Sequence, residues 1–89
     1  MAEPLILALS SADRPGIVAR VTGYLAQMGG NIIEAQQFND LAEDKFFMRV
    51  AFDPGTTDRE EIREGFGRIA HEYGMAWSML RRDRPRRVL

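Results

Sequence analysis

The segment from Asp13 to Ile17 has the residue types of a helix start that can bind a small carboxylate. Its sequence is Asp-Arg-Pro-Gly-Ile, and apolar residues at helical spacing follow it. The first N–H groups of a helix have no partner within the helix, so they are natural donors to an anion. Pro15 lacks an N–H, and Gly16 has no side chain to block the approach. The alternative is an ordinary helix start in which Asp13 acts as the cap.

A second candidate segment lies where the same helix is expected to end. Gly29 and Gly30 stop a helix readily, because glycine adopts the left-handed conformation at a C-terminus. Asn31 follows them and adds one amide side chain to this bare stretch of backbone. From the residues alone, a helix start and a helix stop account for both segments, and a carboxylate site stays an alternative.

Most other chemistry lacks the residues that it needs. The 89 residues contain no cysteine and one histidine, His71, so we expect no disulfide, no metal site and no cofactor. The sequence has no Gly-x-Ser-x-Gly motif and no glycine-rich phosphate motif. The acidic residues at 58–64 suit the first turn and the solvent face of a helix. We therefore predict that this chain by itself carries no catalytic residues.

Six elements must position the two candidate segments, and the apolar spacing predicts them. Strands are expected within 5–9, 32–38, 45–52 and 75–80, and helices within 17–28 and 58–73. The order β-α-β-β-α-β is that of the ferredoxin-like arrangement, in the α+β class. It predicts a four-stranded antiparallel sheet of order 4-1-3-2 with two helices on one face.

The sheet face away from the helices is expected to need a partner. The first strand is apolar on both faces, and Phe47 and Ala51 lie opposite the more apolar face of the third strand. A large exposed apolar patch is unusual for a monomer. We therefore expect a second copy of the chain, or another domain, over this open face or along an edge strand.

Charge divides the chain into an acidic domain, 1–80, and a basic linker, 81–89. The first carries seven Lys and Arg against twelve Asp and Glu, and the second carries five Arg against one Asp. An acidic domain is a poor nucleic-acid surface, although Phe46 and Phe47 could mimic the exposed aromatics of an RNA-binding sheet. No apolar run approaches the ~20 residues of a membrane span, and the N-terminus lacks a signal peptide. We predict a cytoplasmic protein with no nucleic-acid or membrane partner.

Three stretches form a pattern more specific than their local structure requires. They are Ala-Asp-Arg-Pro-Gly-Ile-Val at 12–18, Gly-Gly-Asn-Ile-Ile-Glu-Ala-Gln-Gln at 29–37 and Phe-Phe-Met-Arg-Val at 46–50. The pattern resembles the ACT domain family, a small βαββαβ regulatory module that binds amino acids, usually between copies. All three stretches are similar in particular to the N-terminal ACT domain of formyltetrahydrofolate deformylases, and the last two are unusual for ACT domains in general.

The resemblance implies a regulatory domain that forms dimers or larger oligomers and binds an amino acid such as glycine or methionine. The residues that it assigns to the ligand are Asp13, Arg14, Pro15, Gly16, Ile17, Gly30 and Asn31. Deformylases of this kind are hydrolases that convert 10-formyltetrahydrofolate to formate and tetrahydrofolate, in one-carbon metabolism and purine biosynthesis. Their catalytic domain would follow the linker at 81–89. Two alternatives stay open: a stand-alone ACT protein that regulates a transcriptional or signalling partner, and a dimerisation module without a ligand.

Overall fold

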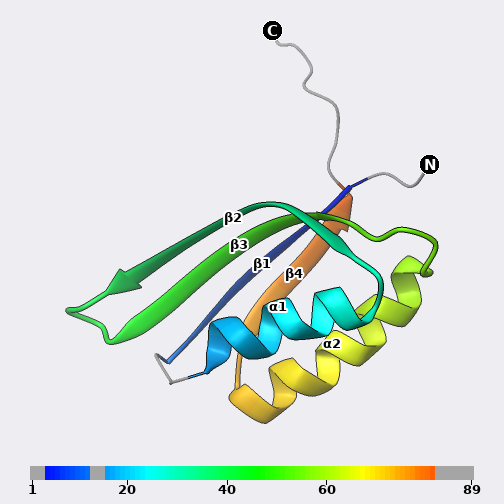
Figure 1. The fold of residues 1–89 in the computed structure, drawn as a ribbon. Helices are drawn as coiled ribbons and strands as arrows, with labels where there is room; N and C mark the ends of the chain where they lie inside the picture. Colours follow the sequence, from blue (N-terminus) through cyan, green and yellow to red (C-terminus); the bar gives the residue numbers. More distant parts are fainter. Residues whose placement is uncertain (1–3, 13–15, 82–89) are drawn as a thin grey trace, which may run out of the picture.

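The computed structural model describes residues 4–12 and 16–81, and it has the predicted ferredoxin-like fold (Figure 1). The antiparallel sheet has the order β2-β3-β1-β4, which confirms the predicted topology. Both helices lie on one face of the sheet, and β2 and β4 are its two edges. The elements are β1 (Leu5–Ala12), α1 (Ile17–Gln27), β2 (Asn31–Asp40), β3 (Lys45–Asp53), α2 (Arg59–Tyr73) and β4 (Ala76–Arg81).

Helix α1 packs one apolar face into the core, as its residue spacing predicts. Ile17, Val21 and Leu25 recur every four residues and are buried. Met28, the last member of the series, caps the helix and is partly buried at the margin of the core. The sheet supplies alternate residues of its strands to the same core: Leu5, Leu7, Leu9, Phe46, Met48, Val50, Phe52 and Met79.

Helix α2 buries Ile62, Phe66 and Ile69 in the core, and one of its glycines packs against α1. Gly65 lies against Tyr24 of α1. A Cβ atom at Gly65 would come within 2.8 Å of the Tyr24 Cζ atom. The Tyr24 hydroxyl donates a hydrogen bond to the Ile62 carbonyl oxygen at 2.9 Å. The missing side chain of Gly65 therefore allows the two helices, rather than helix and sheet, to approach each other.

Strand β1 is central, but only one of its faces is covered. Leu5, Leu7 and Leu9 are buried beneath the helices, whereas Ile6 and Ala8 on the other face are partly exposed. An apolar run such as β1 is typical of a strand covered on both sides. The difference arises because both helices pack on the same side, so the expected open face is present.

Strands β2 and β3 form a hairpin that extends past the helices (Figure 1). The carboxylate of Asp40 accepts hydrogen bonds from the N–H groups of Ala42 and Glu43, at 3.1 and 3.3 Å, and so shapes the turn. Strand β2 has ten residues and is longer than predicted. A bulge between residues 32 and 34 interrupts its pairing with β3. Because the core residues of this hairpin come from β3, most of the edge strand β2 is exposed.

Candidate ligand-binding site

Gly16 lies at the start of α1, where the sequence predicts donors to a carboxylate. It is the N-cap residue, with a left-handed backbone at φ 85°, which favours glycine. No side-chain hydrogen bond from the N-cap residue covers the first N–H groups of the helix. Ile17 is only 2% exposed, so its contribution to a ligand is limited to its N–H group. The predicted residues Asp13, Arg14 and Pro15 lie outside the described residues.

The second segment divides into a packing residue and an exposed amide. The Gly30 N–H donates to the Leu25 carbonyl oxygen at 2.9 Å. A Cβ atom at Gly30 would lie 2.9 Å from that same oxygen and 3.3 Å from the Phe52 ring. Gly30 is therefore explained by close packing of α1 against β3, and its N–H is already used. Asn31, the first residue of β2, is exposed and pairs with Asp53 of β3.

Helix α1 separates the two segments within one chain. Gly16 precedes its first residue, and Gly30 and Asn31 follow its C-terminal end. Eleven helical residues span about 16 Å at 1.5 Å per residue. One amino-acid head group cannot contact both ends, so a single copy does not bring the predicted residues together.

The open face carries a pair of aromatic residues, of which the sequence predicted one, Phe47, and not the other, Phe38. Phe38 and Phe47 face each other across β2 and β3, with ring centroids 6.1 Å apart, and are 64% and 38% exposed. They line a depression of about 540 Å³, together with Ala8 and Arg49 among others. Phe46, expected as a possible exposed partner of Phe47, is buried in the core. Phe38 lies on the same face of β2 as Gln36, because strand residues two apart share a face, and both line this depression.

Comparison with known proteins decides the family. Residues 5–64 match the ACT domain, which is more than half of the chain. The chain belongs to the ACT domain family. Among curated relatives, this ACT domain is 34% identical to the formyltetrahydrofolate deformylase of Bacillus subtilis, over 92% of its own length and 28% of the relative's. It is 32% identical to a UPF0237 protein of Methanococcus maripaludis, over 82% of its own length and 81% of the relative's.

Solved structures agree with the curated relatives. The formyltetrahydrofolate deformylase of Burkholderia mallei superposes with a TM-score of 0.84 at 28% identity, over 89% of this ACT domain and 28% of that chain. These findings confirm the resemblance to the ACT domain of these deformylases. The chain spans under a third of the length of the deformylases that it matches.

Elsewhere in this ACT domain, the described residues offer little titratable chemistry. They contain no cluster of His, Asp or Glu side chains suited to a metal ion. Burial raises the pKa of the Tyr24 hydroxyl, which the nearby Arg68 partly offsets. Tyr24 lies between the two helices, where its hydroxyl donates to the Ile62 carbonyl oxygen. Within residues 4–12 and 16–81, no helix is long and apolar enough to cross a membrane.

Proposed function

We propose that this ACT domain is a regulatory module that binds a small amino acid, such as glycine or methionine, between two copies of the chain. The observation that carries the proposal is the position of the two predicted segments at opposite ends of α1. A site that needs both segments must take one from each copy. Association and ligand binding are then linked, because the ligand favours the associated state.

Pairing of two copies along β2 would bring the two segments together. Strand β1 ends at Ala12, which pairs with Lys45, and Lys45 pairs with Asp40 of β2. The start of α1 is thus near the Asp40 end of β2, and Asn31 is at the other end. When two β2 strands pair antiparallel, the Asn31 end of one copy lies beside the Asp40 end of the other. Asn31 of each copy would then approach Gly16 of its partner.

The two half-sites have complementary chemistry for a zwitterion. The first N–H groups of α1 are donors, and the positive end of the helix dipole favours a carboxylate there. The Asn31 side-chain oxygen is an acceptor for an ammonium group. The left-handed Gly16 leaves room for a ligand, because no atom of residues 4–12 and 16–81 lies within 4 Å of the position that a Cβ atom would take.

The relatives support a place for this module in a larger enzyme. We propose that residues 1–80 form the regulatory domain of a cytoplasmic formyltetrahydrofolate deformylase and that 81–89 link it to the catalytic domain. That enzyme would hydrolyse 10-formyltetrahydrofolate and supply formate for purine biosynthesis. The support is the identity to several proteins of that name over nearly all of this chain.

A thermal-shift titration with single amino acids tests the binding site. A ligand at 100 times its Kd stabilises the folded state by about 2.7 kcal/mol. We expect glycine or methionine to raise the melting temperature of the wild type and not that of Asn31→Ala. The exposed Ser78 on β4 provides the control, since Ser78→Ala should retain the shift. A shift that persists in Asn31→Ala contradicts the site, and no shift with any amino acid on a folded dimer favours a dimerisation module without a ligand.

A second candidate function is that of a stand-alone ACT protein acting on a transcriptional or signalling partner. It is supported by the Methanococcus maripaludis relative, because the match covers 81% of that protein rather than under a third of it. Reading the gene beyond residue 89 separates the two candidates. A downstream formyl-hydrolase sequence supports the deformylase, and a stop codon supports the stand-alone protein.

A further inference from the structure

The two edges of the sheet differ in the side chains that cover them. Along an edge strand, every second residue turns its N–H and C=O away from the sheet, where another strand can pair with them. Strand β2 offers such an edge from Glu34 to Asp40, beyond its bulge, and has no lysine, arginine or proline, residues that commonly protect edges. Strand β4, the opposite edge, is shorter, with six residues, and a side chain from α2 reaches its backbone.

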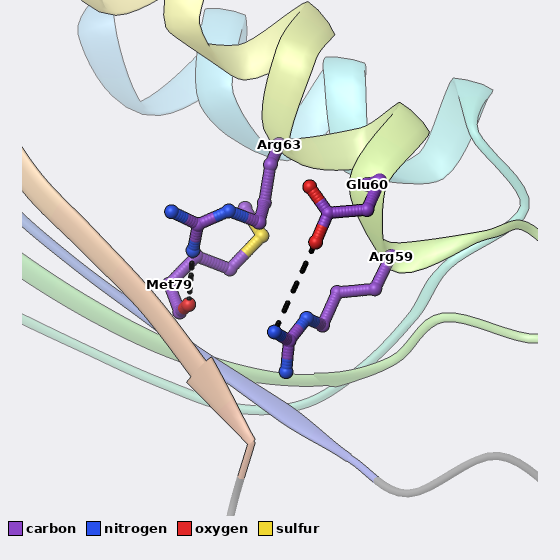
Figure 2. Close-up of polar contacts among 4 residues, drawn as sticks. All are labelled: Arg59, Glu60, Arg63 and Met79. Atoms are coloured by element: carbon purple, nitrogen blue, oxygen red, sulfur yellow. Dashed lines mark hydrogen bonds and ion pairs between the residues drawn. The ribbon is translucent and has the colours of Figure 1, made fainter.

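Arg63 is the side chain that reaches β4 (Figure 2). Its Nη1 atom donates a hydrogen bond to the Met79 carbonyl oxygen at 2.6 Å. Its guanidinium carbon lies 5.7 Å from the centroid of the Trp77 ring, a cation–π distance, and Trp77 packs edge-on against Phe66 at 5.0 Å. These contacts hold the partly buried Arg63 in one place on the strand.

We propose that Arg63 closes the β4 edge and thereby restricts association to the β2 edge, where the partner is a second copy of this chain. A strand that adds to β4 must displace the guanidinium from the Met79 carbonyl and from the Trp77 ring. Hydrogen bonds to charged groups are the stronger ones, so this displacement is costly. No such cation belongs to β2 itself.

Blocking the β4 edge determines whether the chain forms a dimer with no free β2 edge or an open filament. When β2 pairs with β2, both copies use the same surface, and the dimer has no free β2 edge left. When β4 is also available, β2 of one copy can pair with β4 of the next, and this contact repeats into an open filament. Arg63 therefore favours a closed dimer over a filament. This inference rests on the proposed association of two copies, but the test distinguishes a failure of the proposed dimer from a failure of the role of Arg63.

The test compares two arginine substitutions on the same helix. Arg63→Met removes the donor and the charge while keeping an unbranched stem over Trp77. Arg59→Met is the matched control, because the Arg59 guanidinium contacts Glu60 at 3.9 Å and not the β4 backbone (Figure 2). Sedimentation velocity at increasing protein concentration measures the size of the assemblies, and circular dichroism verifies that each variant is folded.

We expect the wild type and Arg59→Met to sediment as one dimeric species. Arg63→Met should form species larger than a dimer, whose size increases with concentration and which bind thioflavin T. Adding Gln36→Lys to Arg63→Met should abolish these species, because the filament contact also uses the β2 edge, which has no lysine in the wild type. If Arg63→Met is poorly folded, Arg63→Lys, which keeps the charge and a donor, should still behave as the wild type.

The proposal is overturned if folded Arg63→Met has the same size distribution as the wild type at every concentration. It is equally overturned if Arg59→Met forms the same large species. A monomeric wild type contradicts the proposed dimer instead. In that case the proposed role of Arg63 still holds if Arg63→Met forms species whose size increases with concentration and Arg59→Met does not, and it fails otherwise.

Discussion

Replacing Gly30 by alanine separates a packing role from a ligand-binding role at this residue. The new Cβ atom would lie 2.9 Å from the Leu25 carbonyl oxygen, 3.3 Å from the Phe52 ring and 3.6 Å from the Asp53 carbonyl oxygen. The distance to Asp53 is an ordinary contact, but the Leu25 oxygen belongs to the backbone, so a change of side-chain rotamer cannot relieve that contact. The C-terminal end of α1 must therefore move away from the start of β2.

The expected cost follows from this displacement. Overpacking of this kind costs about 1–3 kcal/mol, and a lengthened bond between the Gly30 N–H and the Leu25 carbonyl costs about 1 kcal/mol more. Lower entropy of the unfolded chain offsets about 0.4–1 kcal/mol. We expect the free energy of unfolding to fall by about 1–3 kcal/mol, which lowers the melting temperature by about 5–20 °C in a domain of this size.

Gly23 is the matched control for this change. It lies in the middle of α1, and no atom of the described residues is within 4 Å of the position that a Cβ atom would take. Gly23→Ala should therefore stabilise the domain by about 0.5–1 kcal/mol. Urea unfolding of the two variants tests the opposite signs. Equal stability of Gly30→Ala and the wild type would refute the packing argument, and a loss of amino-acid binding alone would return Gly30 to the ligand site.

The contact between the helices gives two further predictions. Gly65→Ala should destabilise the domain by about 1–3 kcal/mol although it improves helix propensity, because the Cβ atom meets the Tyr24 ring; a stability gain in urea unfolding would contradict this packing. Burial raises the pKa of Tyr24 above its ordinary value of 10.0, so the unfolded state releases this proton first and stability falls as the pH rises above about 10. Tyr24→Phe should flatten this decrease of stability with pH. Thermal melts of both proteins from about pH 8 to about pH 11 test the prediction, and parallel curves of melting temperature against pH would refute it.

Apolar spacing was sufficient to predict the elements of this fold and most of its core. Ile17, Val21 and Leu25 show the helical period, and β3 shows the period of two, because in both elements one face meets the core. The order of the elements then predicted the sheet topology. Each of these features depends on residues that are close in sequence.

Features that depend on contacts distant in sequence were not predictable in the same way. The pattern of α2 does not indicate that Gly65 accommodates Tyr24, because the two residues are 41 positions apart in the sequence. The bond from Arg63 to the Met79 carbonyl likewise requires the placement of α2 over β4. The candidate site was predicted as two segments, and the length of α1 shows that one copy holds them apart.

The separation of the half-sites by α1 has a consequence for mixed assemblies. In a dimer paired through β2, each of two ligands would use the helix start of one copy and Asn31 of the other. A heterodimer of the wild type with Asn31→Ala would keep one complete site and bind one equivalent of ligand. Because every copy would contribute one half-site to each of the two ligands, a single copy would form no complete site.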